Sequence, residues 1–434
     1  MLEKLADGLW MPWLLGLFLA VGCWCTLTGR FFPLLHGKTW LKELLFSLKR
    51  PKKREKGLTQ TQALATALAS TVGTGSVAGV AVALTGGGPG AILWMWVSAL
   101  LGLSISFVEK SMAVKYRERG PVGGPMVYME KRLGWRAAAR WFSLWCVLAS
   151  FTSGALVQSN SVSAALHAAL GWNRGVVGLV TALCAGAVLV GGMGRVGRVS
   201  ERLVPLMALL YLGGGTAVIF AHRQALPAAL GQIFRQGLCP QGLGLALRYG
   251  VARGVFTNEA GVGSSAIAHA AADTDSPVRE GFWGMFETGF ATLVVCTVTA
   301  LALLTAGVTG QEGAALVGLA FATALGSWGP LTVALCLLLF AFTSLLGWCC
   351  YGERGLDHLA GRRFRPLYRV LYLLAVWAGS VGGLGQVWAL SDLSIGFMAL
   401  PNLLALAVLA PEGWEDLRRG EKGSILNAFG KKEE

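Results

Sequence analysis

The chain has 434 residues, of which 54% are hydrophobic and only 14% are charged, with a mean hydropathy of +0.58. A soluble globular chain carries about 25% charged residues, so this composition excludes an ordinary soluble domain and indicates a protein that crosses a membrane many times. The net charge of +14 therefore needs to be located before it suggests any partner. Most of the nine cysteines lie in apolar segments, which disfavours a disulfide framework.

Apolar runs of about 18 or more residues predict an all-α polytopic membrane protein with eleven spans. The spans are expected at 10–29, 60–85, 89–114, 139–169, 175–193, 203–221, 249–272, 281–307, 327–350, 367–386 and 387–410. The first run lacks the basic start of a secretory signal, so it is expected to be retained. Met126–Arg136 and Pro227–Leu247 are expected to carry short surface helices, and the polar tail after Pro411 is expected to be solvated or partly disordered.

Lysine and arginine gather in alternate connections between these spans. They lie within residues 30–56, 115–140, 195–202, 362–365 and 418–432. The other connections hold few basic residues, such as Arg174, Arg223 and Arg235. The positive-inside rule then predicts an N-terminus outside the cell and a cytoplasmic C-terminus. The same asymmetry accounts for the net charge, so the lipid bilayer is the expected partner and no nucleic acid is expected.

The second span contains an unusual run, ASTVGTGSVAG, at Ala69–Gly79. Glycine costs a helix interior about 1 kcal/mol relative to alanine, so Gly73, Gly75 and Gly79 are unfavourable in a plain lipid-facing helix. A helix that opens here exposes backbone groups, which is tolerated at membrane depth only beside protein or a water-filled cavity. The glycine spacing of a dinucleotide loop is also present, but no acidic residue follows about 20 positions on.

The seventh span repeats this feature within Ala252–Ala272, where Thr257, Asn258 and Glu259 precede more glycines and serines. Since the two runs are five spans apart, and an odd number of spans reverses direction, the helices that carry them are expected to be antiparallel. Paired interruptions of this kind are typical of transporters built from inverted repeats. The sequence thus predicts the following units: an N-terminal helix with a basic connection at 1–57, a first five-helix repeat at 58–222, an outer loop at 223–244, a second repeat at 245–410 and a cytoplasmic tail at 411–434. Tight helix packing by small residues is the alternative explanation of each run.

Several strings along the chain carry a resemblance to a known family. They are VGTGSVAGVA, GGPGAILWMWVSALLG, AVKYRE, GGPMVYMEKRLG, RGVFTNEAGVGSSAIAHAAA, PVREGFWGMFE, FAFTSLLGW, YGER and VWALSDLSIGFMALPNLLAL. At these strings the chain resembles the alanine/glycine:cation symporters, also called sodium:alanine symporters. The resemblance implies a LeuT-like fold of the amino acid–polyamine–organocation superfamily. It also implies uptake of alanine or glycine with Na⁺ as coupling ion, without an organic cofactor, across a prokaryotic cytoplasmic membrane.

Two positions depart from the family pattern. Ser76 stands where members usually carry asparagine, and Ala291 stands where they usually carry aspartate. Both departures remove a side chain able to bind a cation or to hold a hydrogen bond. They leave the ion, its stoichiometry and the preferred amino acid open.

An amino acid presents a carboxylate and an ammonium group to its site. Amides freed at the start of a half-helix suit the carboxylate, and freed carbonyls suit the ammonium. Gln158 and Asn160 offer side-chain oxygens, with interhelical bonding as their alternative role, and Phe256 and Trp348 are candidate walls of the pocket. The expected substrate-binding residues are Thr74, Gly75, Ser76, Gln158, Asn160, Phe256, Thr257, Asn258, Gly261 and Trp348.

A Na⁺ site is implied by the resemblance to a site shared within the fold. Its expected ligands are the carbonyls of Ala69, Val72 and Phe340 and the hydroxyls of Thr343 and Ser344. A Thr-Ser pair in a span also commonly bonds back to its own helix, which is the alternative here.

Acidic residues inside a membrane are costly and are therefore functional candidates. Glu259 is the strongest, as a group that stabilises the interrupted backbone or sets its charge. Glu287 and Asp392 are candidates for gating or coordination, and Glu109 is expected to pair with Lys110 or to reach the interface. His269 titrates near neutral pH in its ordinary state, and a structural role is favoured for it.

These features predict a secondary transporter that works by alternating access. Motifs of metalloproteases, serine hydrolases and phosphate-binding loops do not occur in the sequence, so no enzymatic activity is expected. One rival keeps the fold but uses H⁺ as the coupling ion, carried by Glu259 or His269. A second rival is a non-transporting membrane receptor, and a third is a channel.

Overall fold

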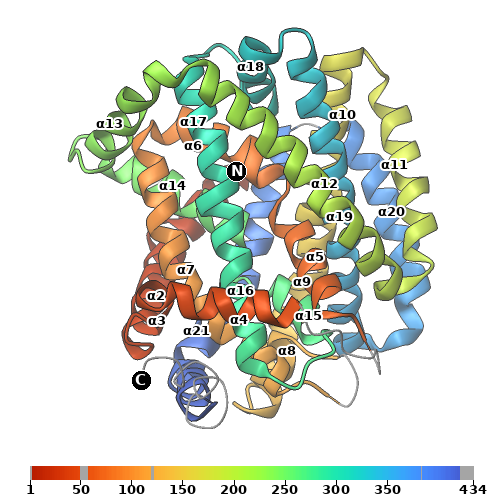
Figure 1. Ribbon diagram of the computed structural model, residues 1–434. Coiled ribbons are helices and arrows are strands. Elements are labelled where there is room, and N and C mark those ends of the chain that lie inside the picture. Colours follow the sequence, from red (N-terminus) through yellow and green to blue (C-terminus); the bar gives the residue numbers. More distant parts are fainter. Residues whose placement is uncertain (1, 49–56, 119–121, 383, 421–434) are drawn as a thin grey trace.

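In the computed structural model the chain is a bundle of helices, with no strand among residues 2–48, 57–118, 122–382 and 384–420, which are the residues the structure describes (Figure 1). Part of the predicted basic connection, residues 49–56, and the end of the predicted tail, residues 421–434, lie outside the described residues.

A helix or an interrupted helix occurs at each predicted span. These elements are α1 (Leu2–Leu9), η1 (Trp10–Leu14), α2 (Leu15–Thr28), α5 (Gln60–Thr71), η2 (Gly75–Gly79), α6 (Val80–Gly87), α7 (Gly90–Lys115), α9 (Arg136–Ala149), η3 (Ser150–Val157), α10 (Gln158–Leu170), α11 (Arg174–Leu189), α12 (Gly192–Ala221), α14 (Leu243–Asn258), α15 (Ser264–Ala270), α16 (Pro277–Gly289), η5 (Phe290–Cys296), α17 (Thr297–Ala306), α19 (Trp328–Ala360), α20 (Arg365–Val381) and α21 (Leu384–Gly420). Within the described ranges, seven helices are long and apolar enough to cross a membrane, and the bent pair formed by α5 and the helix after it makes an eighth. The count of eleven spans therefore stays a prediction.

Shorter helices lie at the two ends of the bundle. They are α3 (Phe32–Leu35), α4 (Gly37–Leu48), α8 (Pro125–Lys131), η4 (Arg223–Ala225), α13 (Leu226–Gly237), α18 (Gly313–Leu325) and η6 (Arg362–Phe364). In Figure 1, α4, α8 and the last turns of α21 lie at the lower end, called here the basic end, while α13 and α18 lie at the upper end, called the α18 end. Helices α8 and α13 confirm a short helix in each of the two predicted segments, but α8 is not a surface helix, because its residues 125–129 are buried. Helices α4 and α18 were not predicted.

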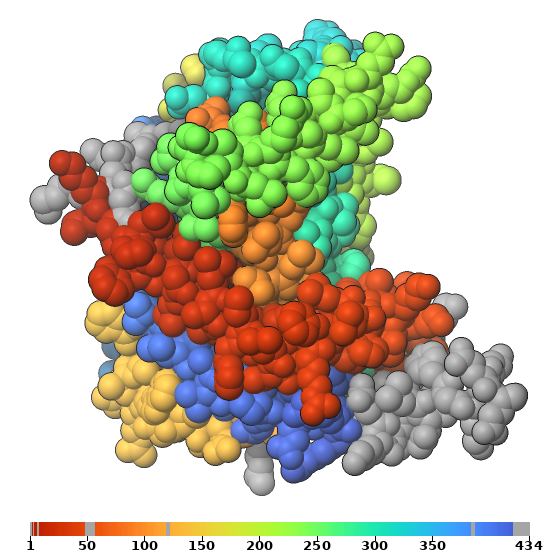
Figure 2. Space-filling view, turned by 90° about the vertical axis from the view of Figure 1, so that its left-hand side faces the viewer, coloured from red at the N-terminus to blue at the C-terminus, as the bar shows by residue number. Residues whose placement is uncertain are grey.

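The N-terminal helices pack along one side of the bundle. Figure 2 shows residues of this segment, in red, next to the blue C-terminal helix. Trp40 and Leu44 of α4 are buried while Leu41 and Leu45 are exposed, so α4 is an amphipathic helix. An ion pair of 3.2 Å between Glu43 and Arg279 fixes α4 to α16.

The prediction of a solvated or disordered tail was wrong for residues 411–420, because α21 continues as a helix to Gly420. Trp414 is buried and stacks on Phe107, with ring centroids 4.3 Å apart. Glu412 forms an ion pair of 2.8 Å with Lys115. Hydropathy alone ends the span where charged residues begin, whereas tertiary packing holds the helix beyond that point.

Candidate substrate and ion site

The first interruption lies between α5 and η2 and is called here the first break, residues 72–74. Helix α5 starts with a capping box between Thr59 and Gln62, and it is buried from Gln62 onward. At Val72 the backbone leaves the helical region (φ −87°, ψ 85°), and helical structure resumes with η2. The helices on the two sides of the break are inclined by 45°. The glycine-rich run therefore opens the helix, as the sequence predicts.

The second interruption lies between α14 and α15 and is called the second break, residues 259–263. Its backbone adopts left-handed conformations at Glu259 (φ 52°), Gly261 (φ 76°) and Gly263 (φ 95°). Glycine suits such positions because it has no Cβ, and a Cβ on Gly261 would stand 2.5 Å from the Leu403 side chain. The sequence predicts this break correctly as well.

The polar groups of the second break are bonded to protein. Asn258 accepts a hydrogen bond from the Ala260 amide at 3.0 Å and donates to Thr292 at 3.2 Å. The Gly261 carbonyl accepts from Asn402 at 2.9 Å. The Glu259 carboxylate accepts from Ser264 and, at 3.5 Å, from Ser70 of α5. Side chains from four other elements thus hold this irregular backbone.

The first break has a different character. Buried oxygens of Thr74, Ser76 and Gln158 (Oγ1, Oγ and Oε1) have no hydrogen-bond partner of good geometry among the described residues. The thiol of Cys296 lies beside the Ser76 hydroxyl, but a thiol is a weak hydrogen-bonding group. Gln158 Oε1 lies 3.8 Å from the Cβ position of Gly73, so it faces the break. Buried polar atoms without partners call for an explanation, and a ligand is one.

The helices next to the two breaks, η2 and α14, meet at Gly75. A Cβ on Gly75 would lie 3.0 Å from Thr257 Oγ1 and 3.1 Å from the Phe256 ring. Both distances are tighter than ordinary carbon contacts, so only glycine lets η2 approach α14 this closely. The structure therefore brings together predicted residues from both halves of the chain: Gly75, Phe256 and Thr257.

The predicted ion ligands lie where α19 crosses the end of α5. Ser344 Oγ donates a hydrogen bond of 2.5 Å to the Ala69 carbonyl. Thr343 Oγ1 donates to the Phe340 carbonyl at 3.0 Å. A Cβ on Gly73, next to Val72, would lie 2.8 Å from Ser344 Oγ. Hydroxyl hydrogens rotate, so these oxygens can turn their lone pairs to a hard cation, for which oxygen is the suitable ligand.

A pair of aromatic rings lies on the α18 side of Gly75. Phe256 and Trp388 pack with ring centroids 5.2 Å apart. The Arg253 guanidinium lies 5.3 Å and 5.5 Å from these two rings and forms an ion pair of 2.5 Å with Asp392. This group joins α14 to α21 across the mouth of the site.

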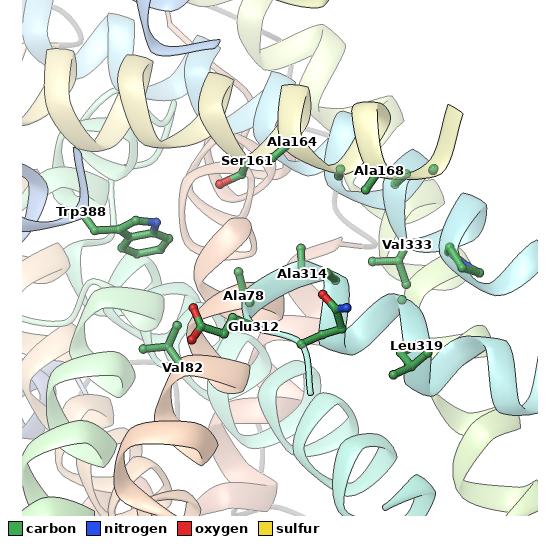
Figure 3. A pocket seen from close by; sticks show the side chains of 18 residues that line it. Ala78, Val82, Ser161, Ala164, Ala168, Glu312, Ala314, Leu319, Val333 and Trp388 are labelled. Atoms are coloured by element: carbon green, nitrogen blue, oxygen red, sulfur yellow. The ribbon is translucent and has the colours of Figure 1, made fainter. Parts of the chain in front are cut away.

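A pocket of about 400 Å³ opens beyond these rings toward the α18 end. Figure 3 shows Trp388 at one side of it, with Ala78 and Val82 beyond the first break and Glu312 next to them. Small side chains of α10, such as Ser161, line the opposite wall. The pocket thus extends from the α18 end to Trp388, which packs on the Phe256 ring beside Gly75.

The basic end of the site is closed by a set of contacts called here the seal. Leu58 and the chain after α15 exchange backbone bonds: Leu58 donates to the Ala271 carbonyl at 3.0 Å, and the Asp273 amide donates to Leu58 at 2.7 Å. Arg117 donates to the carbonyls of Ala272 and Thr274 at 2.6 and 2.5 Å. These contacts close the basic end, whereas the pocket opens at the α18 end.

Comparison with known proteins identifies the family to which the chain belongs. The model of the sodium:alanine symporter family matches residues 1–424 of the chain. The chain belongs to the sodium:alanine symporter family. It is accordingly a multi-pass membrane transporter of an amino acid transporter family, and not an enzyme.

Two relatives of this symporter are named for different amino acids. The sodium/alanine symporter AgcS of Methanococcus maripaludis is 37% identical over 420 residues, which cover 92% of either chain. The probable sodium/glutamine symporter GlnT of Bacillus subtilis is 36% identical over 422 residues, covering 93% of this chain and 87% of that one.

Among solved structures, the symporter is similar to MhsT in complex with L-phenylalanine. The TM-score is 0.60 at 15% sequence identity, covering 84% of this chain and 98% of MhsT. At this identity the likeness shows the fold alone, which is LeuT-like as the resemblance of the sequence implied.

Three predicted substrate residues of the symporter contact neighbouring helices. Asn160 donates to the carbonyls of Gly379 and Gly382 at 3.0 and 2.7 Å, and so joins α10 to α20. Trp348 packs against Gly154 and stacks edge-on with Tyr351 at 5.8 Å. Gly261 is held by Asn402, as described above. These contacts explain why the residues are buried, and their part in substrate binding stays a prediction.

The predicted acidic residues divide into two groups. Asp392 pairs with Arg253 near the ring pair, whereas Glu287 bonds to His269 at 3.1 Å on the basic side of the second break. Glu109 pairs with Lys110 at 2.6 Å, as the sequence suggested. Sequence reasoning missed Glu280, which bonds to His269 at 2.7 Å. The signal was present, because Glu280 and Glu287 are two helical turns apart and share a face of α16.

Ala291, one of the departures, is buried in η5 beside Thr292, whose hydroxyl accepts from Asn258. Sequence reasoning also missed Thr299 of α17, whose hydroxyl donates to the Ser76 carbonyl at 2.9 Å. The carbonyls beyond the first break are therefore partly held by α17.

Proposed function

We propose that this symporter carries small neutral amino acids, alanine or glycine, into the cell together with Na⁺ by alternating access. The observation that supports this most strongly is the set of unpartnered buried oxygens at the first break, on Thr74, Ser76 and Gln158. Leaving a buried polar group unsatisfied costs about 1–3 kcal/mol. A ligand that hydrogen-bonds at this point removes that cost, which makes the break a suitable place for a substrate with both donors and acceptors.

In the proposal the substrate carboxylate binds at the start of η2. The Ser76 amide already donates to the Gly73 carbonyl at 3.2 Å, so the amides of Thr74 and Gly75 are the proposed donors. The positive end of the half-helix favours an anion there. Gln158 Oε1 and the carbonyls of Phe256, Thr257 and Asn258 are the proposed acceptors for the ammonium group.

The size limit of the substrate is proposed to come from Phe256. Its ring approaches the Cβ position of Gly75 to 3.1 Å and stacks with Trp388, so a side chain longer than a methyl group meets this pair. Trp348 is kept as a second candidate wall. This limit is compatible with alanine and glycine as the proposed substrates.

Na⁺ is proposed as the second cargo, held by the carbonyls of Ala69, Val72 and Phe340 and by the hydroxyls of Thr343 and Ser344. The bond between Ser344 and Ala69 supports this, because it joins α19 to the last turn of α5. An ion at this point binds more strongly when the break is in its substrate-holding shape. Na⁺ and the amino acid then favour each other by the same factor.

The basic end is proposed to face the cytoplasm of a prokaryotic cell, since basic residues gather there, which places the N-terminus outside. The proposal includes two inverted repeats, at 58–222 and 245–410. The bundle of α5–α7 and α14–α17 rocks against the remaining helices. Opening of the seal around Leu58 and Arg117 then releases the cargo inside, while the Arg253–Asp392 pair and the two rings close the outer side.

Uptake of labelled alanine into liposomes that contain the purified protein tests the proposal. Accumulation is expected under an inward Na⁺ gradient without a pH gradient, and it should disappear when an ionophore collapses the Na⁺ gradient. Uptake that ignores Na⁺ but follows a pH gradient would instead support the H⁺-coupled rival. Currents far above carrier rates would support a channel, and binding without accumulation would support a receptor.

A further inference from the structure

A second cluster of buried polar groups lies between the second break and the seal. His269 of α15 is fully buried, as are Glu280 and Glu287 of α16, and these three residues are called here the triad. His269 Nδ1 lies 2.7 Å from a Glu280 oxygen, and His269 Nε2 lies 3.1 Å from a Glu287 oxygen. Both ring nitrogens are thus in hydrogen-bonding contact with carboxyl groups.

This geometry requires one proton more than a neutral imidazole carries. A neutral imidazole has one N–H donor and one acceptor nitrogen, whereas an ionised carboxylate only accepts. Two ionised carboxylates against a neutral ring would therefore leave one nitrogen facing an acceptor. Either His269 carries both protons or one of the two glutamates is protonated, and in both cases the triad holds an additional proton.

The surroundings do not remove this need. The charged and titratable side chains on the elements that pack around the triad include Glu109 and Lys110 on α7, Glu259 in the second break, Tyr351 and Glu353 on α19, Glu43 on α4, Arg253 on α14, Arg279 on α16, and Asp392 and Glu412 on α21; the others on these helices, such as Lys115, Arg248, Arg354 and Asp416, lie nearer the helix ends. Lys110 is the cation that approaches the triad, at 4.0 Å from Glu287, but it is already paired with Glu109 at 2.6 Å. No charged or titratable residue occurs in α5. The second oxygens of Glu280 and Glu287 have no partner among the described residues, so two bare negative charges there would be costly.

The seal separates the triad from water at the basic end. His269 is followed directly by the residues that bond to Leu58 and Arg117, and the Glu280 helix begins at Pro277 just beyond them. While the seal is closed, all three side chains are fully buried, so a proton on the triad is shielded from water. When the seal opens, the three groups meet water, where two charged carboxylates and a neutral imidazole are stable without the additional proton.

We propose that the triad of His269, Glu280 and Glu287 is a proton-binding site that takes up one cytoplasmic proton when the seal closes and returns it when the seal opens. The assignment of the cytoplasmic side rests on the proposed function. The site lies apart from the first break and needs no net transfer of protons across the membrane. The direction of the pH dependence follows from this: acid favours the closed seal, and alkali favours the open one.

Amide hydrogen exchange of the purified full chain tests the site without any transport. The amides of Leu58 and Asp273 form the backbone bonds of the seal, so their protection reports its closure. After correction for the intrinsic rate, we expect protection to fall by up to about tenfold per pH unit on the alkaline side, as for one linked proton. In Glu280→Gln the amide donates to a neutral His269, so the seal closes without the additional proton and the pH dependence disappears. Protection that is independent of pH in the wild type would overturn the proposal.

A matched control is Glu43→Gln, which neutralises another buried carboxylate at the basic end, outside the triad. It should keep the wild-type pH profile, and loss of the profile in this variant would contradict the assignment to the triad. Glu287→Gln offers a second neutral variant if Glu280→Gln does not fold.

Uptake into liposomes tests the proton site independently. The exterior pH is held constant while the interior pH is raised from about pH 6 to about pH 8, the range in which imidazole ordinarily titrates. Na⁺-driven alanine uptake should then slow, because the empty carrier closes its seal less often. Glu280→Gln should respond weakly to interior pH. Absence of all Na⁺-driven uptake would instead defeat the proposed function, while the amide exchange result would still decide on the proton site.

Discussion

The two breaks differ in how their polar groups are used. In and next to the second break, Asn258, Glu259 and the Gly261 carbonyl are bonded to protein groups from several helices, while the Ser265 hydroxyl of α15 has no partner among the described residues. In and next to the first break, the side-chain oxygens of Thr74 and Ser76 have no partner of good geometry among the described residues, although both are fully buried. The second break therefore resembles a fixed support, while the first resembles a site that a ligand completes.

This difference assigns separate tasks to two features that look alike in the sequence. A satisfied polar network holds one conformation rigidly, so the second break presents Phe256 and Thr257 in a defined position against Gly75. The unsatisfied break is free to gain its missing bonds from cargo. Substitutions in the first break should thus alter affinity, whereas substitutions in the second should alter stability.

The largest effect is expected for Gly75→Ala. The new methyl group would lie 3.0 Å from Thr257 Oγ1 and 3.1 Å from Phe256, and would press the two breaks apart. Overpacking of this kind costs about 1–3 kcal/mol, so the ratio of maximal rate to half-saturating alanine should fall by about tenfold to hundredfold. Gly79→Ala is the control, because nothing lies within 4 Å of its Cβ position. Equal loss in both variants would mean that contact between the breaks is unimportant.

The next effect concerns the ion. Ser344→Ala removes the hydroxyl that bonds to the Ala69 carbonyl at 2.5 Å. Loss of a hydrogen-bonding oxygen to a charged group costs about 1.5–3 kcal/mol, so the half-saturating Na⁺ concentration should rise about tenfold or more. Ser394→Ala removes a hydroxyl that bonds back to Leu390 in α21 and should leave Na⁺ dependence unchanged. An unmoved Na⁺ dependence in Ser344→Ala, and likewise in Thr343→Ala, would show that the ion binds elsewhere.

Selectivity should change next. Phe256→Ala removes the ring beside Gly75 and should relax discrimination against larger side chains by about tenfold, the effect of one or two methylene groups in an apolar pocket. Trp348→Ala should relax it less, since this ring contacts Gly154 and Tyr351. A competition panel of amino acids in the uptake assay measures both. If Trp348→Ala has the larger effect, the wall of the pocket lies on α19.

The smallest effect on affinity is expected in the second break. Ser264→Ala removes a donor to the Glu259 carboxylate and should lower stability by about 1–3 kcal/mol, while half-saturating alanine changes by less than about twofold. Ser76→Ala should do the reverse, because its hydroxyl has no partner of good geometry to lose. Thermal unfolding and uptake on the same two variants measure this. If both variants lost mainly stability, or both lost mainly affinity for alanine, the proposed difference between the two breaks would be wrong.

Both breaks were predictable because glycines and hydroxyls interrupt apolar runs, and a backbone that departs from a helix leaves that local mark. Helix α18 was not predicted, because its 13 residues are too few for a membrane span and its apolar composition is not typical of a surface helix. The Arg253–Asp392 pair and the triad were missed for another reason. Their members are 139 and 11–18 residues apart along the chain. Glu280 and Glu287 share a face of one helix, but only helix packing brings His269 to them and Arg253 to Asp392.

The seal was equally invisible to sequence patterns. Leu58 and Asp273 are ordinary residues at the edges of spans, and only the antiparallel arrangement of α5 and α15 brings their backbones together. Candidate positions for the cargo ligands could be named because family strings mark them, and they stay predictions, whereas the state of their hydrogen bonds required coordinates.

The central claim is that Na⁺ and the amino acid meet at the first break, and equilibrium binding to the purified protein tests it most directly. Labelled alanine binding is measured at increasing Na⁺, and Na⁺ binding at increasing alanine. The account predicts that each ligand strengthens the other by the same factor, and that Ser344→Ala greatly reduces this factor. Alanine binding of unchanged strength with and without Na⁺ would contradict it.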